Sequence, residues 1–103
     1  MILSENTDAT VRVVAIFKAR NGAELKLREA LQKLVSPTKA ETGCIEYILH
    51  LDTAEPSVFV FYEIWASQAD FDAHTNAGHL AEFSNVASAL LAEPPSIRCL
   101  GRV

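Results

Sequence analysis

The fold is decided by the stretch VFVFYEIW, which runs from Val58 to Trp65. β-branched and aromatic residues fill most of its positions, and a short apolar run of this kind is typical of a β-strand. Side chains alternate between the two faces of a strand, so Phe59, Phe61 and Glu63 share the face of Trp65. The other face is also apolar, which indicates that this strand is covered on both sides.

Three more strands and a first helix are predicted around this stretch. The strands are rich in β-branched or alternating apolar residues and are predicted at 11–17, 44–51 and 96–103. The first helix is predicted to begin at Asn21, which is followed three residues later by Glu24. It is predicted to break near Pro37, because proline disrupts a helix interior.

A second helical region is predicted to open with a capping box formed by Ser67 and Asp70. Residues 76–78 interrupt this region, because they combine asparagine and glycine. The segment beyond the interruption places His79 and Phe83 on one helical face. That face is expected to point to the core or to a pocket.

The order strand-helix-strand-strand-helix-strand is that of the ferredoxin-like fold, an α+β architecture with an antiparallel sheet. We therefore predict one ferredoxin-like domain over residues 11–103, preceded by an irregular N-terminal arm over residues 1–10. The second and fourth strands are the edge strands of such a sheet. This order separates Cys44 from Cys99 and argues against a disulfide between them.

The apolar content points to a partner subunit. The chain has 103 residues, of which 50% are hydrophobic and 21% are charged, a high apolar share for a small domain. Helices cover only one face of a ferredoxin-like sheet, whereas the central strand is apolar on both faces. Two sheets packed face to face would bury the second face, so we expect a homodimer through the sheet.

Charge and composition exclude several classes of protein. The net charge is −4, and no lysine or arginine occurs in residues 40–97, which hold most of the acidic residues. This distribution disfavours nucleic acid as a partner, because phosphate binding needs clustered cations. No apolar run approaches the ~20 residues that span a bilayer, so no membrane association is expected. A cytoplasmic protein is expected, because no signal peptide opens the sequence and its 2 cysteines are too few for a disulfide scaffold.

Glu63 and two histidines form the most suggestive polar group. A carboxylate among apolar neighbours is costly unless it is hydrogen-bonded or paired, and the sequence nearby holds no cation. His74 or His79 is therefore the candidate partner of Glu63, and a carboxylate-oriented histidine suits general base chemistry near neutral pH. The alternative is a structural hydrogen bond from Glu63 to a helix backbone.

A metal site is not expected from these histidines. His74 and His79 are five residues apart, a spacing that does not place them on one helical face. Zinc or iron would also need a third ligand. Cys44 and Cys99 have no identifiable base nearby, so cysteine nucleophile chemistry has no support either.

Three segments together carry a family resemblance. The stretch from Glu41 to Tyr47 (ETGCIEY), the stretch from Phe59 to Ser67 (FVFYEIWAS) and the histidines His74 and His79 resemble the antibiotic biosynthesis monooxygenase (ABM) domain family. The resemblance implies a dimeric α+β barrel. For many members it also implies oxygenation of quinol-like or polycyclic aromatic substrates by dioxygen, without flavin, haem or metal.

The resemblance also implies roles for individual residues. Trp65, Tyr47 and Phe83 would line the substrate pocket, His74 or His79 would be the base, and Glu63 would orient one of these histidines. Haem-degrading relatives use a strand asparagine and a helical histidine at positions that hold Ala15 and Ser84 here, so haem degradation is disfavoured.

Two other functions remain open at this point. One is an isomerase of a small phosphorylated or carbonyl metabolite, in which the strand-terminal Arg98 or Arg102 would contribute to phosphate binding. The other is a non-catalytic barrel that only binds a hydrophobic small molecule.

Overall fold

The computed structural model describes residues 9–103, so the arm predicted for residues 1–10 lies almost entirely outside the described residues. The elements follow one another as β1 (Val11–Lys18), α1 (Glu24–Gln32), α2 (Val35–Lys39), β2 (Cys44–Leu51), β3 (Val58–Trp65), α3 (Gln68–Thr75), α4 (Gly78–Leu90) and β4 (Ser96–Leu100). The predicted bounds of β2 and β3 are confirmed. The last strand is shorter than predicted.

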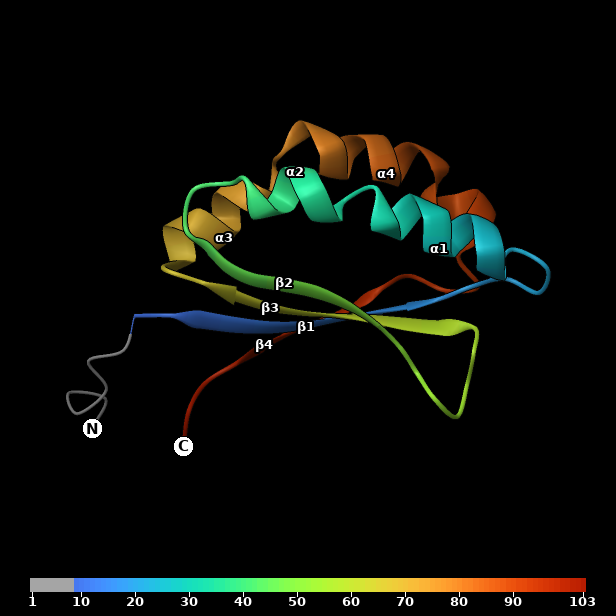
Figure 1. Ribbon diagram of the computed structural model, residues 1–103, viewed down its shortest axis with the longest axis horizontal. Coiled ribbons are helices and arrows are strands. Elements are labelled where there is room, and N and C mark those ends of the chain that lie inside the picture. Colours follow the sequence, from blue (N-terminus) through green and yellow to red (C-terminus); the bar gives the residue numbers. More distant parts are fainter. Residues whose placement is uncertain (1–8) are drawn as a thin grey trace.

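The four strands form one antiparallel sheet in the order β2-β3-β1-β4. This is the predicted ferredoxin-like order, with β2 and β4 at opposite edges, and it confirms the α+β fold class. β1 pairs with β3 along its whole length, from Val11 opposite Trp65 to Lys18 opposite Val58. All helices lie on one face of the sheet (Figure 1).

The core lies between this sheet face and the helices. From β3 it takes Phe59, Phe61 and Trp65, which alternate with half-buried residues on the other face. From α1 it takes Leu27 and Leu31, which are four residues apart and therefore share one side of the helix. The face of β3 that carries Glu63 is thus the face that the helices cover.

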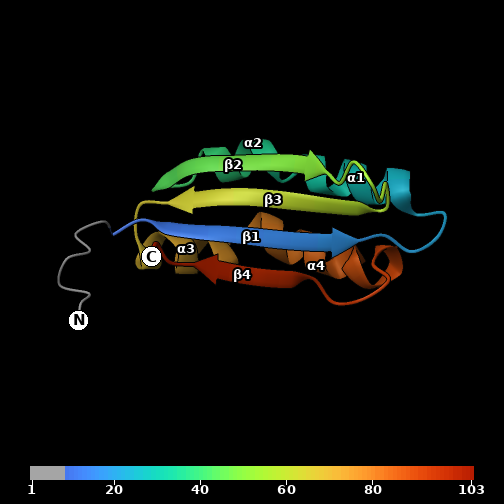
Figure 2. The same cartoon turned by 90° about the horizontal axis from the view of Figure 1, so that it is seen from below.

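The opposite sheet face carries no helix among the residues that the structure describes (Figure 2). Val60, Tyr62 and Ile64 of β3 point to this open face and are only half-buried in the single chain. Ile48 of β2 pairs with Tyr62 in the neighbouring strand and is 43% exposed. An apolar surface that spans adjacent strands is unusual for a monomer.

The start of the first helix differs from the prediction. Glu24 is its first residue, and Ala23, not Asn21, occupies the N-cap position. Gly22 adopts a positive φ of 86°, which places a tight turn where the cap was predicted. Turn chemistry therefore overrides the capping signal at this point.

Pro37 does not end a helix. The helix is interrupted between Gln32 and Val35, and Pro37 lies in the first turn of the short helix α2. Backbone N–H groups in a first turn have no intrahelical partner, so a proline at this position removes no hydrogen bond.

The second helical region follows the prediction closely. The Ser67 hydroxyl accepts a hydrogen bond from the Asp70 backbone N–H at 3.1 Å, which confirms the predicted cap. Residues 76 and 77 separate α3 from α4, so the predicted interruption is one residue shorter than expected and Gly78 begins α4. No helix within residues 9–103 is long and apolar enough to cross a bilayer.

Candidate active site

The break between α3 and α4 brings the two histidines together. His74 lies in the last turn of α3 and His79 in the first turn of α4, so the spacing of a continuous helix does not apply to them. Asn76 caps α3, and Ala77 is extended with φ −70° and ψ 148°. The ring centroids of the two histidines are 6.3 Å apart as a result.

Glu41 joins the two rings. Its Oε2 lies 2.8 Å from Nδ1 of His74 and 2.7 Å from Nε2 of His79, and the hydroxyl of Thr38 lies 3.1 Å from the same His79 nitrogen. Glu41 precedes β2 in a loop that closes at Gly43, where φ is 80°. We call Glu41, His74 and His79 the histidine–glutamate cluster.

Gly43 explains how Glu41 reaches His74. A Cβ at Gly43 would overlap the carboxylate of Asp70, which belongs to the first turn of α3. The carbonyl of Gly43 also accepts a hydrogen bond from Ala66 at 2.8 Å, just before that helix. The loop that carries Glu41 is therefore packed directly against the helix that carries His74.

Glu63 contacts both Trp65 and His74, one of its two predicted partners. Its Oε1 accepts a hydrogen bond from the Trp65 indole at 2.9 Å, and Nε2 of His74 lies 3.9 Å away, within ion-pair distance but beyond hydrogen-bond distance. The carboxylate within hydrogen-bond distance of His74 is that of Glu41, at 2.8 Å. Burial raises the pKa of Glu63 to about 7, while the hydrogen bond from Trp65 opposes that shift and the charge of Glu41 adds to it.

His74 is buried and held in one orientation. Its ring lies 4.6 Å from Trp65 and 5.4 Å from Tyr47, measured between centroids. Burial lowers the pKa of His74, and the hydrogen bond and charge of Glu41 act in the opposite direction. With Nδ1 donating to Glu41, the ring presents Nε2 as a lone pair toward Glu63 and the adjacent pocket.

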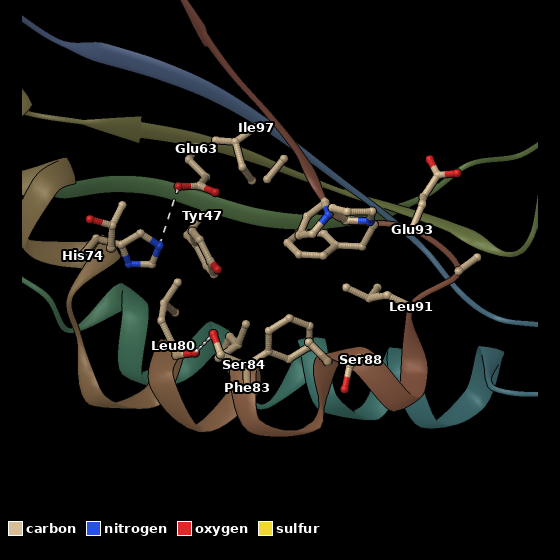
Figure 3. A pocket seen from close by; sticks show the side chains of 18 of the residues that line it. Tyr47, Glu63, His74, Leu80, Phe83, Ser84, Ser88, Leu91, Glu93 and Ile97 are labelled. Atoms are coloured by element: carbon tan, nitrogen blue, oxygen red, sulfur yellow. Dashed lines mark hydrogen bonds and ion pairs between the residues drawn. The ribbon is translucent and has the colours of Figure 1, made fainter.

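A pocket of about 640 Å³ lies between the sheet and the helices α3 and α4. Figure 3 shows Glu63, Tyr47 and His74 at one end of it, and Ser88 and Glu93 at the other. Most of its lining is apolar. A pocket of this size and polarity suits a small aromatic molecule.

The predicted pocket residues divide into two groups. Tyr47, Phe83, Glu63 and His74 line the pocket. Trp65 is fully buried behind the wall, where it holds Glu63. His79 does not line the pocket; it contacts Glu41, which in turn contacts His74, and its side chain is 21% exposed.

Glu41 is the member of the cluster that the sequence patterns did not single out. It lies 33 residues before His74 and 38 before His79, so periodicity could not connect them. The available signal was the sequence Glu-Thr-Gly-Cys, which begins one of the segments of the family resemblance.

A metal site was not expected from the sequence because no third ligand accompanied the two histidines. In the histidine–glutamate cluster, Glu41 is such a ligand. One ligand atom from each of the three residues lies within 4.8 Å of the others. His50, by contrast, lies on the edge strand β2 and contacts backbone carbonyls only.

Comparison with known proteins places this site in a family. The family model for antibiotic biosynthesis monooxygenase matches residues 10–86. The chain is 31% identical over 90 residues to the Mycobacterium tuberculosis protein named "Putative monooxygenase Rv0793", covering 87% of this chain and 88% of that protein. It is 34% identical over 94 residues to "Uncharacterized protein sll1783" of Synechocystis, covering 91% of this chain but only 64% of that protein.

Solved structures agree with the sequence relatives. The structure of PA3566 from Pseudomonas aeruginosa superposes with a TM-score of 0.87 at 33% identity, covering 92% of this chain and 95% of that one. The structure of Rv0793 superposes with a TM-score of 0.85, covering 91% of this chain and 95% of that one. The chain therefore belongs to the antibiotic biosynthesis monooxygenase family.

Proposed function

We propose that the protein is a cofactor-independent monooxygenase that oxidises a small quinol or polycyclic aromatic substrate with dioxygen. The observation that supports this most is the placement of His74. Its Nδ1 is held by Glu41, and its ring borders a largely apolar pocket. A neutral imidazole in this setting can act as a general base toward a phenol.

The reaction needs little from the protein beyond this base. His74 takes the phenolic proton at Nε2, and the resulting anion reduces dioxygen within the pocket. The peroxide that forms then collapses, so that one oxygen atom becomes the new quinone oxygen and the other leaves as water. The substrate supplies all the electrons.

Glu63 and the pocket wall support the charged states. Near neutral pH the carboxyl of Glu63 is present in both its protonated and its ionised form, because its pKa is about 7. A protonated carboxyl donates a hydrogen bond to a developing oxyanion, and apolar walls exclude the water that would compete for it. Phe83 and Tyr47 supply aromatic surface for the substrate ring.

We also propose that two chains associate through the open face of the sheet. The half-buried Val60, Tyr62 and Ile64, with Ile48 beside them, support this arrangement. Packing two such faces removes apolar surface from water. Sedimentation at micromolar concentration tests it: a dimer is expected, and a monomer contradicts the proposal.

One observation favours an isomerase as the second candidate. Arg20 lines the pocket and donates to the Ser88 carbonyl at 3.1 Å, so a cation is available at the end remote from His74. Ile97 of β4 also lines the pocket, which places its neighbour Arg98 on the other sheet face. A phosphate would therefore meet Arg20 and not Arg98.

Dioxygen uptake with a panel of hydroquinones and phenolic polycyclic aromatics separates these functions. We expect wild type to take up dioxygen, with or without a chelator, and His50→Ala to do the same. In His74→Ala, kcat should fall by about a hundredfold or more. Turnover of a carbonyl or phosphorylated substrate without oxygen would favour the isomerase. Tight binding with no turnover of any panel member would leave a binding protein.

A further inference from the structure

We infer that the histidine–glutamate cluster is a binding site for one divalent transition-metal ion, such as Zn²⁺. The ion would be held by Nδ1 of His74, Nε2 of His79 and Oε2 of Glu41. This inference concerns the three side chains and their geometry, and it describes a different state from the proposed oxidation. A bound ion would place the proton of His74 on Nε2 and so exclude the base role, which belongs to the metal-free protein.

The spacing of the donor atoms fits coordination. Oε2 of Glu41 lies 2.8 Å and 2.7 Å from the two imidazole nitrogens, and all three atoms lie within 4.8 Å of one another. Bonds of about 2.0–2.2 Å to nitrogen and oxygen put neighbouring donors roughly 3 Å apart around a zinc ion. An ion would replace the two hydrogen bonds of Glu41, with the carboxylate moving outward and the two rings adjusting to bring their nitrogens into bonding distance.

The chemistry of the donor set selects the kind of ion. Two imidazoles and one carboxylate suit zinc, iron, nickel and copper, whereas magnesium and calcium prefer oxygen ligands alone. Three protein ligands leave coordination positions open for water. Water can reach them, since the Glu41 and His79 side chains are 17% and 21% exposed, while the buried His74 fixes the inner side of the site.

The charge of the site also favours a cation. In the part of the chain that the structure describes, the ion pairs of Glu41 are with the two histidines. Both histidines are able to bind a metal in their neutral form, which leaves the Glu41 carboxylate with an uncompensated negative charge. A divalent ion neutralises that charge.

The surroundings of His74 provide a second carboxylate behind the ligand. When Nδ1 binds an ion, the proton of the neutral ring resides on Nε2, which lies 3.9 Å from Oε1 of Glu63, so the ring must move toward Glu63 to donate a hydrogen bond to it. A carboxylate behind a ligating histidine is the usual arrangement in zinc sites, where it fixes the tautomer and the ring orientation. No proton has to leave either histidine, because each ring moves its proton to the nitrogen that does not bind.

Calorimetric titration of chelator-treated full-length protein with ZnCl₂ tests the inference. Wild type is expected to bind one equivalent per chain, and His79→Ala and Glu41→Gln are each expected to weaken binding at least tenfold. His50→Ala is the matched control, because it removes the third histidine from an unrelated position. Circular dichroism of each variant confirms that it is folded.

A second measurement uses wild type alone, so it does not rely on the folding of any variant. Histidine ring ¹⁵N resonances are followed during the same titration. His74 and His79 are expected to shift with a stoichiometry of one, while His50 does not. The inference is overturned if wild type binds no Zn²⁺ at micromolar concentration, if both cluster variants bind as tightly as wild type, or if His50→Ala alone removes binding.

Discussion

The two faces of the sheet differ in which residues are out of place on them: polar residues are buried on one face, and apolar residues are partly exposed on the other. On the face that the helices cover, the polar residues Glu63 and His74 are buried, and each has a defined partner, Trp65 for Glu63 and Glu41 for His74. On the open face, the apolar residues of β3 are half-buried, and no helix among the described residues covers them. The buried polar residues of the covered face are therefore accounted for by contacts within the chain, whereas the apolar residues of the open face support the proposed association with a second chain.

The largest effect is expected from Trp65, on the covered face. Its side chain is fully buried and also holds Glu63. Trp65→Ala should lower the free energy of unfolding by about 3–5 kcal/mol, measured by urea denaturation, because it leaves a large cavity. A loss below about 1 kcal/mol would show that this side chain is not part of a packed core.

A charge on the open face should act on association. Tyr62→Glu is expected to weaken the dimer roughly a hundredfold, about 3 kcal/mol, because it would place an unpaired charge in the interface. Analytical ultracentrifugation measures the shift. Glu29→Lys on the exposed side of α1 is the control and should leave the dimer unchanged. If the two variants had the same dimer dissociation constant, the open face of the sheet would not be the interface.

A pH effect of similar size is expected from Glu63. Its pKa is raised from the ordinary value of 4.5 to about 7 in the folded protein, so the folded state retains a proton that the unfolded state has lost. Stability conferred by this group is therefore present below about pH 4.5 and is lost as pH rises to about 7. The change is on the order of 3 kcal/mol.

Glu63→Gln isolates this contribution, because glutamine keeps the shape and does not titrate. The difference in unfolding free energy between the variant and wild type should move in favour of the variant between pH 4.5 and 7 and then level off. Taking this difference also removes the opposite trend from His74, whose lowered pKa makes the fold less stable as the pH falls below its ordinary value of 6.5. A difference that does not vary with pH would mean that Glu63 is ionised throughout.

The smallest effect concerns the start of α3, which positions His74. Ser67→Ala removes the side-chain acceptor of the Asp70 N–H and should cost about 1 kcal/mol. Chemical denaturation at one pH is sufficient to measure it. The contrasting change, Ala23→Ser at the uncapped start of α1, should be stabilising by a few tenths of a kcal/mol.

Most of the sheet was predictable from the sequence because its signals are local. Alternation fixes which face of β3 carries Trp65, and the bounds of β2 and β3 follow from the same pattern. The cap at Ser67 was predictable for the same reason. The errors at Asn21 and Pro37 arose where a turn at Gly22 and the permissive first turn of α2 outweighed a local preference.

The site was only partly predictable because its assembly is not local. His74 and Glu63 were singled out, since a histidine and a carboxylate stand out among apolar neighbours. The partner of His74 was not, because Glu41 reaches it only through the packing of Gly43 against Asp70. Likewise, the meeting of His74 with His79 depends on the break between α3 and α4, which changes the geometry that their spacing suggests.

The proposed base role of His74 depends most directly on its protonation state in the chelator-treated protein. Two-dimensional ¹H–¹⁵N NMR of the histidine rings at pH 8 measures this state. We expect a neutral ring with its proton on Nδ1, donated to Glu41, and an unprotonated Nε2 that is available to a substrate phenol. A ring protonated on Nε2, or on both nitrogens, would contradict it.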